Sequence, residues 1–281
     1  VMNDKDDGQV AYDGPLVIAV SHMSASASEI VAAALQDHGR AIIVGGKATH
    51  GKGTVQQILP LNRSFISRLT GDSGQLKFTI SKFYRINGTT TQRDGVAPDI
   101  VLPSLLDYIG TSEGELPRAL ESDKIAEAQY DSLDQVSAFF TSLQRASTKR
   151  IQSNPDYKYI MEDIKRAKKR KENPSVSLNE ATRRKENSAN QQRTETRNKE
   201  RSSRSLPMEE YFEINLKIAE NEKPLKKLDP PKAKKESTDP NKNPVDPSLN
   251  TFSVDPELRE ALQILSDFMN LNKKLAGSSS N

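Results

Sequence analysis

The sequence predicts an α/β core followed by a mainly α-helical part. Two continuous apolar runs, at residues 16–20 and 41–44, have the pattern of strands that are covered on both faces. Between them, helical spacing begins at Ser26 and stops at Gly39. This β-α-β order predicts two parallel strands joined by a helix. Beyond Pro103 the apolar residues recur at helical spacing instead.

Further strands are expected before Pro103. Residues 54–59 are typical of a strand, and residues 75–86 alternate apolar and polar side chains. Asn87-Gly88 then predicts a hairpin turn into a strand at 89–92, and residues 100–102 form a last apolar run. We therefore expect one domain at residues 1–105 and a helical domain at residues 106–281.

The helical part shows separate apolar stripes. One stripe contains Val136, Phe139, Phe140 and Leu143, and another contains Tyr157, Ile160, Met161 and Ile164. Residues 206–218 and 258–269 predict two more amphipathic helices, the second beginning at Asp255 and Pro256. Residues 187–205 and 223–247 are rich in charge and proline, which predicts mobile linkers.

Composition excludes several classes of protein. There is no cysteine, so disulfides and thiolate metal sites are excluded, and the net charge of +3 is small. No apolar stretch is long enough to span a bilayer. The basic run at 165–171 suggests contact with nucleic acid or anionic lipid, but no aromatic residue is interleaved for base stacking. A solvated helix face is the favoured interpretation.

Ser26 is the best candidate for a nucleophile. It follows a buried strand and opens a helix, which places its hydroxyl at a sheet edge, and the backbone N–H of Ala27 would be one oxyanion donor. The alternative is an ordinary helix N-cap, a role for which Ser24, Ser26 and Ser28 all compete.

Lys52 is the matching candidate for a general base. It stands between Gly51 and Gly53 before a strand, and burial would lower the pKa of its amine toward neutrality. Gln56 lies four residues on and would hydrogen-bond that amine. The alternatives are a solvated loop lysine or a phosphate-binding lysine, and Gly53 breaks the phosphate-loop pattern.

The histidines allow a rival triad with His22 or His50 as base. No carboxylate is evidently placed to orient His50, so we interpret both as surface or turn residues. No spacing of histidines and carboxylates repeats on one face, so neither a metal nor a cofactor is expected.

Several segments together resemble the tail-specific (carboxy-terminal processing) proteases, the serine–lysine peptidases of family S41 in bacterial periplasms. In the first part these are Ser24-Ala-Ser-Ala-Ser-Glu-Ile30, Gln36-Asp-His-Gly-Arg40, Gly51-Lys-Gly-Thr-Val-Gln56 and Gly95-Val-Ala-Pro-Asp-Ile100. Downstream, Ile160-Met-Glu-Asp-Ile164, Val176-Ser-Leu-Asn179 and Arg184-Lys-Glu-Asn187 resemble the helical extension of the long branch.

The resemblance implies roles for individual residues. Ser26 would be the nucleophile, Lys52 its general base and Gln56 the group that orients the lysine. Asp37 matches an acidic residue that is important in the branch, with a catalytic or a structural role. The implied fold is a partial βα-unit protease core of the crotonase/ClpP-like type. The implied protein is an endopeptidase of the periplasm or cell envelope.

The resemblance also implies partners and a limit on activity. Substrates would be proteins with exposed apolar carboxy-terminal tails, an adaptor protein and self-association would be further partners, and nucleic acid is not expected. The chain begins inside the core, before which the family has a PDZ domain and a Gly-rich loop with the other oxyanion donor, so we expect no activity from it alone. The alternative is a non-catalytic envelope scaffold, against which the intact set of Ser26, Lys52 and Gln56 argues.

Overall fold

The computed structural model describes residue 10 and residues 12–61, 74–204, 211–213, 224–228 and 255–278 of the 281-residue chain. The chain forms two compact units, one of residues 1–173 with 256–281 and one of residues 174–255. The predicted boundary at residue 105 falls inside the first unit, because later helices pack against the sheet in that unit.

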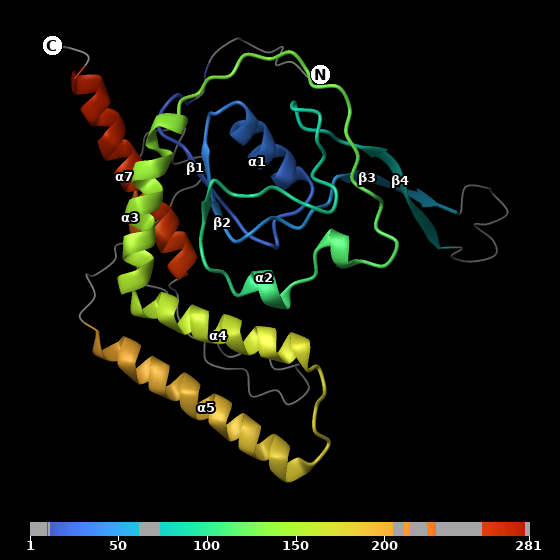
Figure 1. Cartoon of the computed structure of the whole chain (residues 1–281), viewed down its shortest axis with the longest axis vertical. Coiled ribbons are helices and arrows are strands. Elements are labelled where there is room, and N and C mark those ends of the chain that lie inside the picture. The colour runs from blue at the N-terminus through green and yellow to red at the C-terminus, as the bar shows by residue number, and fades with distance from the viewer. Residues whose placement is uncertain are drawn as a thin grey trace. The chain divides into compact units, whose positions relative to one another are not determined.

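The centre of the first unit is a parallel three-stranded sheet in the order β1-β2-β5 (Figure 1). Its strands are β1 (Val17–Val20), β2 (Ile42–Gly45) and β5 (Ile100–Val101). Helix α1 (Ala27–Asp37) connects β1 to β2. The predicted strands, helix and parallel pairing are therefore confirmed, and the mixed α/β class with them.

Both faces of this sheet are covered. In β2, Ile42 and Val44 belong to a buried cluster with residues of α3 and α7, while Ile43 belongs to the cluster on the α1 side. Successive residues of a strand point to opposite faces, so one continuous apolar run fills both cores.

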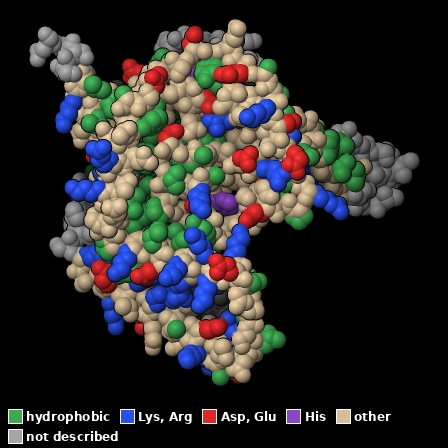
Figure 2. Space-filling view, in the orientation of Figure 1, with side chains coloured by type: hydrophobic (Ala, Val, Ile, Leu, Met, Phe, Trp, Pro, Cys, Tyr) green, Lys and Arg blue, Asp and Glu red, His purple; other side chains and the backbone are tan. Residues whose placement is uncertain are grey.

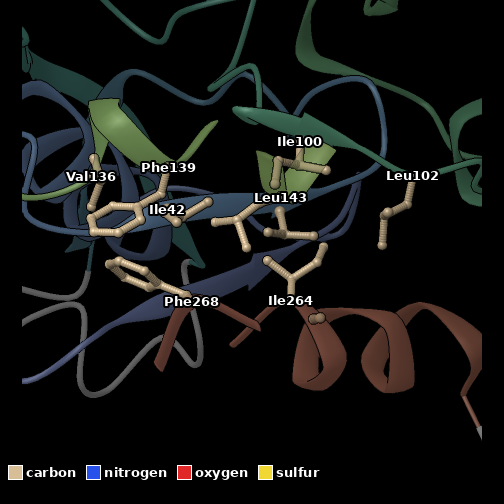
Figure 3. Packing of buried hydrophobic residues seen from close by; sticks show 10 residues of the cluster. Ile42, Ile100, Leu102, Val136, Phe139, Leu143, Ile264 and Phe268 are labelled. Carbon is tan, nitrogen blue, oxygen red and sulfur yellow. The ribbon is translucent and has the colours of Figure 1, made fainter. Parts of the chain in front are cut away.

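Two helices from the later part of the chain supply the second cover, α3 (Phe140–Ser153) and α7 (Pro256–Ser278). Phe139, just before α3, meets Phe268 of α7 edge-to-face with ring centroids 5.0 Å apart. Figure 3 shows this pair beside Ile42, with Leu143 and Ile264 also turned toward the strands. The last helix thus completes the core of the first sheet.

The packed face of α1 differs from the predicted one. The apolar pattern predicts a face of Ile30, Val31, Ala34 and Leu35. Of these, Leu35 packs against the core, but Ile30 and Val31 are 45% and 54% exposed. Glu29, Ala32 and Ala33 are buried instead. The physical reason is that alanine lets the helix approach the sheet closely, and that the buried glutamate has hydrogen-bond donors around it.

The antiparallel hairpin pairs β3 (Thr54–Pro60) with β4 (Gln75–Lys82) and extends away from the parallel sheet (Figure 1). The predicted turn is present, with the Gly88 N–H donating to the Arg85 carbonyl. The predicted partner strand at 89–92 is wrong, because those residues form no strand and β4 pairs with β3 instead. The alternation in β4 is real, but Leu76 and Ile80 are exposed.

The remaining elements of the first unit are short helices and one long one. They are α2 (Leu106–Ile109), the 3-10 helices η1 (Glu113–Glu115) and η2 (Ser137–Phe139), and α4 (Pro155–Glu172). The apolar stripes predicted near residues 140 and 160 lie on α3 and α4. In these stripes Leu143, Tyr157 and Ile164 are buried, whereas Met161 is exposed.

The second unit contains α5 (Glu180–Ser203) and the paired strands β6 (Tyr211–Glu213) and β7 (Lys226–Leu228). The prediction of a mobile linker at 187–205 is wrong as far as residue 203. There the helix is stabilised by the Asn179 cap and by an ion pair one turn apart, Arg184 to Glu180 at 2.7 Å. Residues 211–213 are strand where a helix was predicted; the rest of 206–218 and most of 223–247 lie outside the described residues.

Candidate active site

Ser26 and Lys52 both lie on loops at the carboxyl edge of the parallel sheet. The loop of residues 21–26 leads from β1 to α1, and the loop of residues 46–53 leads from β2 to β3. Since β1 and β2 are parallel, both loops leave the same edge, where α/β proteins place their sites. The amide of His50 donates to the carbonyl of Ser24 at 2.9 Å, which joins the two loops directly.

Ser26 has an unusual backbone conformation. Its φ of 59° and ψ of −113° fall in a region that residues other than glycine rarely adopt. Such a residue costs about 1–3 kcal/mol and is found most often at functional sites. A strained serine between a strand and a helix is also how other hydrolases expose a nucleophilic hydroxyl. Ser26 therefore has a backbone that an ordinary helix cap does not need.

The carboxylate of Glu29 holds this conformation. Its Oε2 accepts from the amide of Ser26 at 2.7 Å and from the amide of Lys52 at 2.9 Å. Because both amides donate to the same oxygen atom, the backbone nitrogens of Ser26 and Lys52 are held close to each other. The other oxygen accepts from the amide of Gly51 at 2.7 Å and from the hydroxyl of Thr49. Glu29 is completely buried, and these four donors compensate the burial of its carboxylate.

The two glycines beside Lys52 are required by close packing. A Cβ on Gly51, whose φ is +93°, would stand 2.6 Å from the carbonyl oxygen of Arg93. A Cβ on Gly53 would stand 2.6 Å from the amide nitrogen of Gln92. The loop with Lys52 therefore packs directly on the backbone of residues 92–93, as the flanking glycines suggest.

The amine of Lys52 donates to Oε1 of Gln56 at 3.3 Å, the contact expected from their spacing. The β3–β4 register shifts between Val55 and Gln56, and such bulges redirect side chains near active sites. Lys52 is only partly buried by the residues that the structure describes.

His22 lies in the first of these two loops and His50 in the second. Their ring centroids are 6.3 Å apart. Of the two alternatives, surface or turn, His22 is a turn residue, and it is buried. Nδ1 of His50 faces Oε2 of Glu113 at 3.9 Å, a carboxylate that the sequence alone does not place there. At that distance the pair is too long for a hydrogen bond that would fix the ring.

Asp37 is not brought to the other candidates. It is the last residue of α1, and an 11-residue helix is about 16 Å long, so Asp37 lies far from Ser26. There Arg85 donates to both of its carboxylate oxygens, at 2.5 and 2.9 Å, and Asn87 donates to Oδ1. These contacts attach the end of α1 to the segment after β4.

Two further predictions concern the oxyanion and metals. Ala27 is the first residue of α1, so its N–H has no acceptor within the helix and is available to a ligand.

Within the described ranges no group of three or more histidine or carboxylate side chains is arranged to hold a metal ion. Among those same residues no helix has the length and apolarity to cross a membrane.

Comparison with known families agrees with this geometry. Residues 1–102 match peptidase family S41, and residues 106–270 match the C-terminal domain of tail specific protease (DUF3340). The second match covers more than half of the chain, so the chain belongs to the tail-specific protease family that this domain defines. The first match covers less than half of the chain and makes residues 1–102 similar to the S41 peptidases.

Individual relatives carry the same names. The chain is 39% identical over 182 residues to the tail-specific protease of Haemophilus influenzae, covering 63% of this chain and 26% of that protein. It is 39% identical over 127 residues to a carboxy-terminal-processing protease of Bartonella bacilliformis, covering 42% of this chain and 27% of that protein. The chain therefore spans about a quarter of the length of these relatives.

Glu29 is the residue that the interpretation of the sequence missed. It stands three positions after Ser26, and a serine followed three residues later by glutamate is the spacing of a capping box. That signal predicts the bond from Glu29 to the Ser26 amide. The bonds to Gly51 and Lys52 come from 22 and 23 residues away, and no local pattern indicates them.

Proposed function

We propose that this chain contributes the catalytic serine and lysine of a serine endopeptidase. Ser26 Oγ attacks the scissile carbonyl, and Lys52 takes its proton and returns it to the leaving amine. Water then releases the acyl-enzyme. Gln56 orients the lysine amine, and the Ala27 N–H donates to the oxyanion. The family membership makes peptide hydrolysis the activity to explain.

One observation carries this proposal: a single buried oxygen, Oε2 of Glu29, accepts from the amides of both Ser26 and Lys52. A catalytic pair must be held in a fixed mutual position, and backbone hydrogen bonds to one fixed oxygen do this. A scaffold without catalysis needs neither the clamp nor the strained backbone of Ser26.

The proposed substrates are proteins with exposed, apolar carboxy-terminal tails, in the periplasm or cell envelope. Met23, Ile30 and Val31 support this, because they are exposed apolar side chains next to Ser26 in sequence. The complete oxyanion hole and the substrate domain are properties of the intact protein, so we propose that the 281-residue chain alone hydrolyses peptides poorly. An adaptor protein and self-association remain proposed partners.

The test is proteolysis of a tail-bearing unfolded protein by the intact enzyme. Ser26→Ala and Lys52→Ala should each abolish cleavage, with a loss of at least about 10³-fold. Ser28→Ala is the matched control, because its hydroxyl donates to the Ala25 carbonyl and it takes no part in the proposed chemistry. Full activity of either the Ser26 or the Lys52 variant would contradict the dyad and favour the scaffold.

A further inference from the structure

Two lysines converge on one tyrosine beside the proposed site. The ammonium nitrogen of Lys47 lies 4.6 Å from the centre of the Tyr108 ring, and that of Lys168 lies 5.0 Å from it. Lys47 follows β2, Tyr108 lies in α2, and Lys168 lies in α4. Both distances are within the range of cation–π contact. We name these three residues the lysine–tyrosine cluster.

The lysine–tyrosine cluster is attached to the loop that bears the proposed base. The amide of Lys47 donates to Oδ2 of Asp107 at 3.0 Å, which joins the loop to α2. Lys47 precedes Lys52 by five residues, so their Cα atoms are at most about 18 Å apart. A substrate in extended conformation covers that distance with about five residues.

Positive charges outnumber negative ones on this surface. The Asp107 carboxylate attracts the ammonium group of Lys47 and so helps to raise the pKa of that lysine. On α4 the run 165–171 carries six cationic side chains, of which Lys171 pairs with Glu115 at 2.6 Å. Figure 2 shows Lys and Arg side chains gathered over α4 and reaching toward α2. The surface is therefore suited to an anion.

The chemistry of Tyr108 agrees with two ammonium groups beside it. Hydrogen bonding to Lys47 lowers the pKa of Tyr108, and the charges of Lys47 and Lys168 lower it further. The same hydrogen bond raises the pKa of Lys47, so this lysine stays charged over the physiological range. Lys47 is therefore a lasting positive charge in the cluster.

We propose that the lysine–tyrosine cluster binds acidic side chains of the polypeptide substrate, within about five residues of the scissile bond. This inference rests on the proposed function, since the substrate is then a polypeptide bound at this edge of the sheet. A nucleic acid is a poorer fit, because the ring of Tyr108 is occupied by ammonium groups and is not free to stack on a base.

The experiment uses two peptides that differ only in a Glu-Glu or Gln-Gln pair, three to five residues from the cleaved bond. The intact enzyme should cleave the Glu peptide about fivefold faster in kcat/KM at low salt. The ratio should approach one at 0.5 M salt, since screening weakens the attraction. In K47Q/K168Q the ratio should be near one at all salt concentrations. The control K149Q/K158Q removes two exposed charges elsewhere and should keep the preference.

A second measurement separates this inference from the proposed function. The Ser26→Ala protein does not turn over, so peptide affinity can be measured by fluorescence anisotropy in the presence and absence of K47Q/K168Q. A Glu preference that survives K47Q/K168Q would overturn the inference and leave the peptidase assignment intact. Equal affinity for both peptides, together with cluster-dependent binding to phosphatidylglycerol vesicles or single-stranded DNA, would also overturn it. Loss of the preference in K47Q/K168Q alone supports it, even where no cleavage is seen.

Discussion

The two ends of α1 each hold a carboxylate, and the two carboxylates do different things. At the first end Glu29 accepts from three backbone amides and one hydroxyl and is completely buried. At the last end Asp37 is paired with the side chain of Arg85. Both are acidic residues on one helix, but only Glu29 contacts the loops that carry Ser26 and Lys52.

The difference lies in what each carboxylate fixes. A carboxylate bonded to backbone amides sets the positions of main-chain atoms, and so of the side chains that start from them. A carboxylate bonded to an arginine joins two segments without setting either backbone conformation. Resemblance singled out Asp37, whereas geometry singles out Glu29. Activity should therefore respond most at the first end of the helix, and folding stability at the last.

The largest expected effect is that of Glu29→Gln. An amide has only one acceptor oxygen, so donors among Ser26, Gly51, Lys52 and Thr49 lose a partner or meet an N–H group. The kcat/KM of the intact enzyme should fall at least about 100-fold, equivalent to about 2.7 kcal/mol. Circular dichroism should show a folded protein. Asp37→Asn is the matched control, the same chemical change at the other end of the helix. Equal losses in both variants would erase the contrast between the two ends.

Asp37→Asn should act on stability. The Asp37 carboxylate and the Arg85 guanidinium are both largely buried, and removal of one charge leaves the other without its partner. We expect the free energy of unfolding to fall by about 2 kcal/mol, measured by urea denaturation. Activity per folded molecule should stay within about threefold. A large fall in kcat without loss of stability would instead assign Asp37 a part in the chemistry.

Gln56→Ala sharpens the comparison at the first end. It removes the acceptor of the Lys52 amine without touching the backbone clamp. We expect kcat to fall about tenfold with KM little changed, because orientation of the base matters in the chemical step. Gln57→Ala, at the next exposed position of β3, is the control. A Gln56→Ala enzyme with normal kcat would show that the lysine needs no orienting group.

The smallest effect concerns Asp99, which joins the last turn of α1 to β2. Its carboxylate accepts from the amide of Ile43 and the side chain of Gln36. Burial raises its pKa above the ordinary value of 3.8. The folded state therefore binds this proton more tightly than the unfolded state. The resulting stability is present below pH 3.8 and is lost as the pH rises through the folded pKa.

Asp99→Asn should remove that slope. As the pH rises from 3.8 to neutrality, the free energy of unfolding of the wild type should fall relative to that of the variant. The expected difference is less than about 1 kcal/mol. Urea denaturation at a series of pH values measures the difference. Parallel stability curves for the two proteins would show that burial does not perturb this carboxyl.

Local patterns predicted the elements that local physics controls. The strands β1, β2 and β5, the helix between them, and the pairing of Lys52 with Gln56 all follow from spacing within a few residues. The buried face of α1 did not follow, because the hydrogen-bond donors that allow Glu29 to be buried lie 20 or more residues away in the sequence. The hairpin partner of β4 was misjudged for the same reason, since β3 precedes it by a long connection.

The sequence by itself determined the chemistry available to this protein: a serine opening a helix, a lysine between glycines, and the motifs of the tail-specific proteases. Only the tertiary structure decided which carboxylate contacts the loops of Ser26 and Lys52 and which helix covers the sheet. Glu29 accepts from residues beyond the next strand, and α7 packs on β1 from more than two hundred residues away. Periodicity carries no information over such separations, because burial and hydrogen bonding there depend on where the chain returns in space.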